Sequence, residues 1–99
     1  MKSFGEIIKE ARESRGLFLR QVAAEFNIDQ AIISKFEYGG RKPSKEQVLS
    51  FAKFFKLDTE ELLVAWLSDK VIYDLKDEML ADKALKVAEQ KIQYRRKLN

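Results

Sequence analysis

The positions of proline and glycine, which interrupt helices, limit the possible folds of this chain more than any other feature. Its 99 residues include one proline and four glycines, and none of the five lies beyond Pro43. Elsewhere apolar residues recur at intervals of three and four, the spacing of an amphipathic helix rather than of a strand. We therefore interpret all five residues as breaks between helices, and we expect an all-α fold.

Five short helices are predicted before about residue 67. Ser3 and Glu6 have the spacing of a capping box and begin a helix that Gly16 ends. A second helix is expected over residues 19–26. The positions expected to face inward from these two helices are Phe4, Ile7, Ile8, Ala11, Leu19, Val22, Ala23 and Phe26.

The next three helices also begin at recognisable caps. Asp29 precedes a helix from about Gln30 to Glu37, and Ser44 precedes the fourth. Asp58 or Thr59 is expected to cap the fifth. Their predicted inward positions are Ile32, Ile33, Phe36, Val48, Leu49, Phe51, Ala52, Phe55, Leu62, Leu63 and Trp66.

The C-terminal third follows another pattern. One long helix is expected from about Asp77 to Lys97, after a continuation or bend near residues 75–77. Its seam, spaced by four, three and four, is Ala81, Leu85, Ala88 and Ile92, widened by Met79, Leu80 and Ala84. We therefore expect a domain over residues 1–67 and a helical extension over residues 68–99.

Composition excludes several classes of function. The chain has no cysteine and no histidine, which removes the usual metal ligands and catalytic bases, so we expect no enzyme, catalytic residue, metal or cofactor. No apolar run approaches a membrane span, and the charged start is unlike a secretory signal, so we expect a cytoplasmic protein. Residues 1–58 carry 11 Lys and Arg against 8 Asp and Glu, a balance that fits a polyanionic partner.

The second and third predicted helices form a helix-turn-helix, because only a short turn separates them. If the later helix enters a major groove of DNA, its exposed side chains reach base edges. Gln can pair with adenine, Lys with guanine, and an alanine methyl can touch thymine. The candidate base-contacting residues are Gln30, Ala31, Ser34 and Lys35, followed by Tyr38, Arg41 and Lys42 as candidate phosphate contacts.

Four segments carry a resemblance to a known family: "EARESRGL", "VAAEFNID", "ISKFEYGGRKPS" and "LSFAKFFKLD". Over about residues 4–63 the chain resembles the Cro/repressor-type helix-turn-helix family, also called the xenobiotic-response-element family. The resemblance implies a five-helix domain that binds operator DNA, usually as a two-fold dimer. It implies the same four base-contacting positions, a phosphate-binding loop that includes Gly39, and a structural Glu37 paired with Arg12 or Arg15.

The chain departs from this family at the start of the second helix. Phe18 and Leu19 stand where the family often has Ser or Thr followed by Gln. Since that Gln normally contacts a phosphate, we expect Arg20 or Gln21 to make the backbone contact instead. Gly40 replaces a frequent Lys or Arg, which removes one phosphate contact.

The functional expectation is a transcriptional regulator that binds double-stranded DNA, a homodimeric repressor or autoregulator at a palindromic operator. In size and layout the chain is similar to phage repressors and to controllers of restriction-modification systems. The expected dimer interface is Trp66, Leu67, Val71, Ile72, Leu75, Ala81, Leu85, Ala88 and Ile92. Two alternatives stay open: the extension folds back on its own domain, or it docks a second protein, as in an antitoxin.

Overall fold

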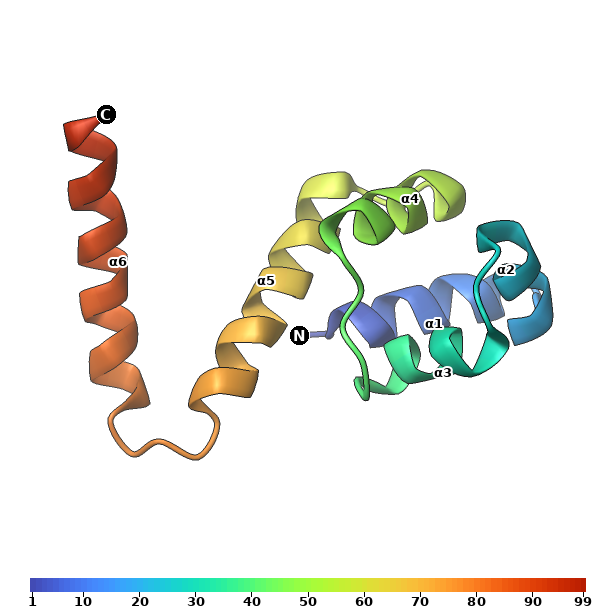
Figure 1. The fold of residues 1–99 in the computed structure, drawn as a ribbon, viewed down its shortest axis with the longest axis horizontal. Coiled ribbons are helices and arrows are strands. Elements are labelled where there is room, and N and C mark those ends of the chain that lie inside the picture. The colour runs from blue at the N-terminus through green and yellow to red at the C-terminus, as the bar shows by residue number, and fades with distance from the viewer.

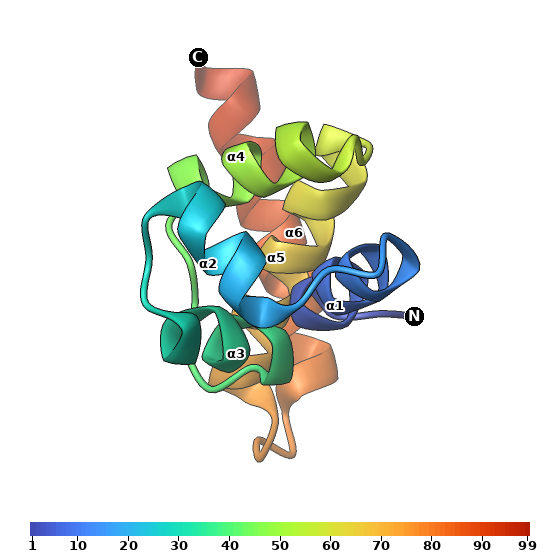
Figure 2. The same ribbon diagram turned by 90° about the vertical axis from the view of Figure 1, so that its right-hand side faces the viewer.

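The computed structural model describes residues 1–99 and contains six helices and no strand, so the all-α expectation is confirmed. α1 to α5 form one body, and α6 stands apart from it at the other end of the longest axis (Figure 1). Turned by 90°, α2 and α3 lie side by side in front of α5 (Figure 2). The helices are α1 (Phe4–Ser14), α2 (Leu19–Phe26), α3 (Gln30–Tyr38), α4 (Lys45–Phe55), α5 (Thr59–Leu75) and α6 (Ala81–Leu98).

The predicted capping box at Ser3 is formed, and the predicted cap Ser44 forms a second one. Ser3 Oγ accepts a hydrogen bond from the backbone N–H of Glu6 at 3.1 Å, and the Glu6 carboxylate accepts one from the N–H of Ser3 at 3.1 Å. Ser44 and Gln47 repeat this exchange at the start of α4, with distances of 3.2 and 2.8 Å. In the first box, the hydrogen bonds between Ser3 and Glu6, first that of the Ser3 backbone, lower the pKa of Glu6, because they favour its charged form.

The hydrophobic core is built around Phe51 of α4, whose side chain is fully buried. Its ring centroid lies 4.5 Å from that of Phe26, 5.8 Å from that of Phe4 and 6.0 Å from that of Phe36, so helices α1 to α4 meet at one aromatic cluster. Leu49, expected to face inward, is exposed on the other side of α4. The core comprises Phe4, Ile8, Val22, Ala23, Ile33, Phe36, Val48, Phe51, Ala52, Phe55, Leu62 and Trp66.

Gly5 corrects the expectation that every glycine separates two helices. It is the second residue of α1 and is buried. A Cβ at this position would lie 2.3 Å from the carbonyl oxygen of Glu37 and 2.4 Å from that of Phe36. Gly5 therefore permits α1 to cross the C-terminal end of α3 at backbone contact.

The break before the last helix begins where the bend was expected, at residues 75–77, but the last helix starts later than expected. α5 begins after Asp58, whose side chain caps it, and continues through Leu75, while α6 begins at Ala81 rather than near Asp77. Carboxylates are unfavourable at the negative end of a helix dipole and favourable at the positive end. Asp77 and Glu78 therefore disfavour further extension of α5 and suit the segment that leads into α6.

The body and the extension differ in burial. No residue of α6 is buried, so the alternative in which the extension folds back and adds to the core is not what the structure contains. The division after residue 67 falls inside α5 and stays a prediction. None of the six helices combines the length and the apolar composition that a bilayer crossing requires.

Candidate nucleic-acid interface

The helix-turn-helix is made by α2, a short turn and α3. Asn27 ends α2 in the left-handed conformation, with φ of 52°, which turns the chain sharply toward α3. Ala23 is buried in α2 and Ile33 in α3, and the half-buried Ile28 packs against the same core. The small side chain of Ala23 lets the two helices approach closely, and Ala23 and Ile33 face inward as predicted.

The outer face of α3 presents polar side chains at its N-terminal end. Asp29 caps the helix by accepting a hydrogen bond from the N–H of Ala31 at 2.7 Å. Gln30, Ala31 and Lys35 are exposed, as predicted, whereas Ser34 is half-buried and less accessible than expected. This face therefore offers an amide, a methyl group and an ammonium group to a partner.

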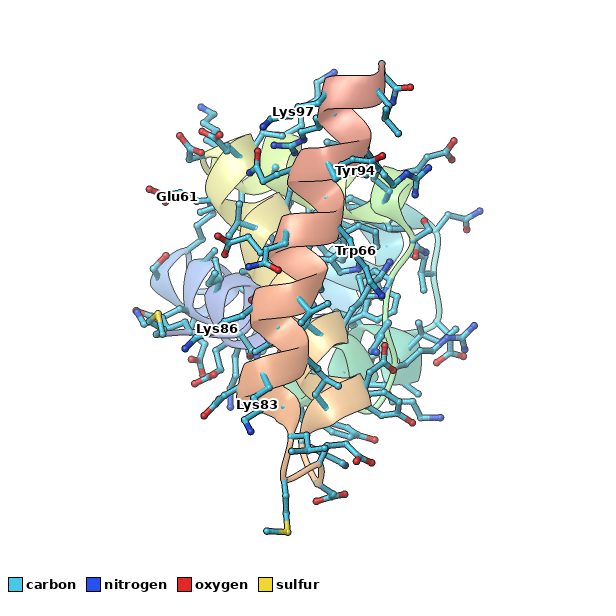
Figure 3. All side chains as sticks on the ribbon, turned by 90° about the vertical axis from the view of Figure 1, so that its left-hand side faces the viewer. Glu61, Trp66, Lys83, Lys86, Tyr94 and Lys97 are labelled. Carbon is cyan, nitrogen blue, oxygen red and sulfur yellow. The ribbon has the colours of Figure 1, made fainter.

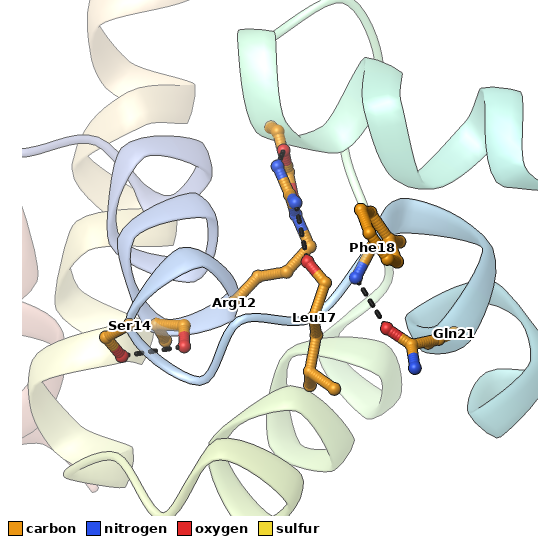
Figure 4. A network of polar contacts seen from close by, with 7 residues as sticks. Arg12, Ser14, Leu17, Phe18 and Gln21 are labelled. Carbon is orange, nitrogen blue, oxygen red and sulfur yellow. Dashed lines mark hydrogen bonds and ion pairs between the residues drawn. The ribbon is translucent and has the colours of Figure 1, made fainter.

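A buried ion pair holds α3 against α1 (Figure 4). Arg12 Nε donates to Glu37 Oε2 at 2.7 Å and Arg12 Nη2 donates to Glu37 Oε1 at 3.0 Å, a bidentate geometry. Arg12 Nη1 also donates to the carbonyl oxygen of Leu17 at 2.9 Å. The hydrogen bonds to Glu37 raise the pKa of Arg12 further above its ordinary value.

Of the two arginines considered as partners of Glu37, the structure thus selects Arg12. Arg15 instead donates to the carbonyl oxygen of Phe54 at 3.0 Å. Its guanidinium also lies 5.6 Å from the Phe54 ring centroid and 5.5 Å from that of Phe55, within the range of a cation–π contact. Arg15 therefore fixes α1 to α4.

The start of α2 has no side-chain cap, and only one of the two hydrogen bonds of a capping box is formed there. Phe18 provides no cap, but Gln21 Oε1 accepts a hydrogen bond from the N–H of Phe18 at 2.7 Å (Figure 4). The Gln21 amide nitrogen has no partner within the chain and is free to donate outward. Arg20 lies with its guanidinium 4.5 Å from the exposed Phe18 ring centroid, which holds the cation at the same edge.

The loop after α3 is shaped by Gly39 and anchored to α5. Gly39 has φ of 86°, a conformation that favours glycine, and it ends α3 by directing the chain away. Pro43 is buried, and its carbonyl oxygen accepts a hydrogen bond from Trp66 Nε1 at 3.0 Å. Lys42 Nζ lies 3.9 Å from the ring centroid of Tyr73. Two side chains of α5 thus fix the position of the basic loop.

A pocket of about 290 Å³ lies between this loop, the start of α1 and α5. Arg41, Lys42 and Lys76 contribute three cations to its lining, against the single carboxylate of Asp69. That carboxylate accepts a hydrogen bond from the N–H of Phe4 at 2.9 Å. The rim of the pocket is therefore electropositive beside the exposed Tyr38.

The structure separates the predicted site residues into two groups. The helix-turn-helix and its loop carry Arg20, Gln21, Gln30, Ala31, Ser34, Lys35, Tyr38, Gly39, Arg41 and Lys42. α2 lies at the end of the body away from α6, whereas the loop after α3 lies beside α5 (Figure 1). The predicted dimer residues lie on the later part of α5 and on α6. Trp66 is an exception and a correction: its ring is buried in the core and hydrogen-bonded to the loop, so it is not available to a partner subunit.

Two further residues matter that the sequence reasoning missed. Ile72, assigned to the dimer interface, lines the loop pocket, and Val64, which was not singled out, is exposed on α5. Tyr73 was not singled out, although it carries the contact to Lys42. Helical spacing relative to Trp66 provides a signal for both, because it defines which side of α5 faces the core.

A family model described as helix-turn-helix matches residues 8–62, which is more than half of the chain. No curated relative matches the chain. The matched region begins within α1, includes the Arg12–Glu37 pair, α2, α3 and the basic loop, and ends in the first turn of α5.

Proposed function

Because this chain belongs to the Cro/repressor-type helix-turn-helix family of DNA-binding proteins, we propose that it is a homodimeric repressor or autoregulator acting at a palindromic operator. The exposed N-terminal face of α3, fixed by the buried Arg12–Glu37 pair beside a basic loop, is the observation that carries this proposal. The regulator acts by occupying a promoter and needs no covalent chemistry.

Base readout falls to the exposed face of α3. Gln30 is the proposed partner of adenine, Lys35 is the proposed donor to guanine, and the methyl group of Ala31 is proposed to contact thymine. Ser34 is half-buried, so only its hydroxyl group is within reach of a base edge. The rigid attachment of α3 to α1 supports this role, because sequence discrimination requires the reading side chains to hold one position relative to the groove.

Contacts to the phosphate backbone flank this helix on both sides. At the start of α2, the Arg20 guanidinium and the free amide nitrogen of Gln21 are the proposed donors. On the loop after α3 the proposed contacts are Tyr38, the backbone of Gly39, Arg41 and Lys42. Such contacts set the register of a protein on DNA and supply affinity without reading the sequence.

A two-fold operator requires two copies of α3 about 34 Å apart. We place the dimer contact on the exposed apolar residues of the C-terminal third. Most of them, including Leu67, Val71, Ile72, Leu85 and Ile92, are exposed within a single chain, and contiguous exposed apolar patches mark interaction sites. The proposed interface is Leu67, Val71, Ile72, Leu75, Ala81, Leu85, Ala88 and Ile92.

Selection of bound fragments from a random DNA pool at near-physiological salt tests the proposal. Enrichment of a palindrome with half-sites about one helical turn apart is the expected result. Retention of DNA that depends on salt but shows no enriched sequence would contradict a sequence-specific dimer.

A second candidate function is favoured by the unburied apolar residues of α6. In this reading the extension docks a different protein, as in an antitoxin, and DNA binding is autoregulatory. A stable complex with a second polypeptide encoded beside this gene, formed at the expense of self-association, would support that reading over homodimerisation.

A further inference from the structure

α6 is a long helix with an apolar stripe and nothing packed on it. Figure 3 shows Lys83, Lys86, Tyr94 and Lys97 along a helix that stands in front of the body. Within its 18 residues, Leu85 is 42% exposed and Ile92 is 51% exposed. Most helical stability in proteins comes from packing of an amphipathic face, so this stripe requires a complementary surface.

α5 carries a second apolar stripe on the side away from the core. Its inner side is used by Leu62 and Trp66, both buried. Val64, Leu67 and Val71 are 58%, 51% and 40% exposed, and they recur at intervals of three and four residues. α5 therefore presents an unpaired stripe, ending near Leu75, that has the same helical spacing as the stripe of α6.

The two stripes match in an antiparallel register. If Val71 lies opposite Leu85, then Leu75 lies opposite Ala81 and Val64 lies opposite Ile92, because both helices repeat the intervals of four and seven residues. The central pair is Ser68 opposite Ala88, two small side chains that permit close approach, and Leu67 lies at the edge of the seam, level with Glu89.

The net charges of the two helices and the outer end of the seam favour the same pairing, while the register places Lys70 level with Lys86 and Asp74 level with Asp82 nearer the turn. α5 carries four carboxylates and one lysine, a net charge of −3, whereas α6 carries six Lys and Arg and two carboxylates, a net charge of +4. The register above brings Glu60 and Glu61, at the start of α5, opposite Arg96 and Arg95, near the end of α6. Opposite charges that flank an apolar seam determine partner and orientation in paired helices.

We propose that α6 is an exchanged arm, which packs antiparallel on the outer stripe of α5 of a second copy of this chain. In a single chain α6 diverges from α5 (Figure 1), and the segment between them carries its own turn, with Glu78 N–H donating to the Leu75 carbonyl oxygen at 3.0 Å. The complement of each stripe is thus supplied by the partner, and exchange of identical elements is a low-cost route to a dimer. This inference rests on the proposed homodimer and names its contact.

The arrangement also connects the arm to the DNA-binding loop. The outer side of α5 holds the partner's α6, and the inner side holds the loop through Trp66 and Tyr73. One rigid helix therefore relates the dimer contact to the phosphate-binding residues, as a two-fold operator requires.

Disulfide cross-linking tests the exchange cleanly, because the chain has no cysteine of its own. The full-length double variant Val71→Cys/Leu85→Cys is oxidised mildly and run on a denaturing gel without reductant. The expected product has twice the mass of the chain. Two separate single-cysteine variants, Val71→Cys and Leu85→Cys with different tags, should give the mixed disulfide when they are combined.

A matched control moves one cysteine to the polar face of the same helix. Val71→Cys combined with Gln90→Cys should give little cross-linked product, since Gln90 lies away from the seam. A disulfide within a single chain of the Val71→Cys/Leu85→Cys variant would overturn the proposal in favour of self-closure. Absence of any disulfide in that variant would overturn it as well.

Failure of the exchange is distinguishable from failure of the proposed function. The unmodified chain is submitted to the random-pool selection independently of the cross-linking. If the protein selects a palindrome but the cysteine variant cross-links only within one chain, the proposed regulator is supported and the exchange of α6 is rejected. If the variant cross-links between two chains but the protein selects no DNA sequence, the exchange of α6 is supported and the proposed regulator is rejected.

Discussion

Replacement of Arg12 by methionine tests whether the buried ion pair is what fixes α3 to the body. The side chains of Arg12 and Glu37 are 13% and 8% exposed and are joined by two hydrogen bonds. Arg12→Met keeps much of the apolar contact of the side chain but leaves the Glu37 carboxylate buried without its partner. It also removes the donor to the Leu17 carbonyl oxygen.

The expected loss of stability is large for one side chain. Breaking a buried ion pair by removing one partner costs about 3–5 kcal/mol. The free energy of unfolding of a small domain is about 5–15 kcal/mol, and each kcal/mol corresponds to roughly 4–8 °C in Tm for a chain of this size. Arg12→Met should therefore lower Tm by roughly 12 °C or more.

Thermal and urea unfolding, followed by circular dichroism, measure this effect. Glu10→Gln is the matched control, because it breaks the exposed pair of Glu10 with Lys2 and should cost less than about 1 kcal/mol. The double variant Arg12→Met/Glu37→Leu leaves no uncompensated charge, so it should be more stable than Arg12→Met alone. A cost for Arg12→Met as small as that of Glu10→Gln would refute the reasoning.

Further substitutions probe single features of the interface and fold. Lys35→Ala should weaken specific binding by about 1–3 kcal/mol in a titration with the selected operator, and an equal loss on unrelated DNA would reassign Lys35 to a phosphate. Arg41→Ala should weaken binding to all sequences and flatten the plot of log K against log salt by about 0.9, whereas an unchanged slope would rule out its phosphate contact. Gly5→Ala should cost about 1–3 kcal/mol in urea unfolding, because its Cβ meets a carbonyl oxygen of α3 at 2.3 Å; wild-type stability would mean that the helices separate freely. Glu6→Gln should reduce the loss of stability on acidification, since the lowered pKa of Glu6 gives a contribution present above its ordinary pKa and lost as pH falls through the lowered value; identical pH profiles would contradict this.

Much of the body was predictable because its signals are local. Caps such as Ser3, Ser44 and Asp29, together with apolar spacing, located the first five helices, and the capping hydrogen bonds are formed as expected. The resemblance narrowed the partner of Glu37 to two arginines. Only the packing of α1 against α3 determines that Arg12 reaches it, while Arg15 turns toward α4.

The errors arise where tertiary contact overrides a local pattern. Gly5 was interpreted as a break, but backbone contact between α1 and α3 requires a glycine there. Trp66 was expected both to face inward and to join a dimer interface; its buried indole, which fixes the loop through Pro43, confirms the first and excludes the second. The start of α6 was predicted too early, near Asp77, because the region has no glycine or proline to mark it. Only the carboxylates around Asp77 indicated the break.

The most direct measurement of the central claim is a comparison of the DNA motifs selected by the wild-type chain and by Gln30→Ala. If α3 reads bases as a two-fold pair, the variant should lose its preference at one base pair, at the same position in both half-sites, and keep the remaining motif. An unchanged motif, or a uniform loss of binding to every sequence, would contradict the placement of Gln30 in the major groove.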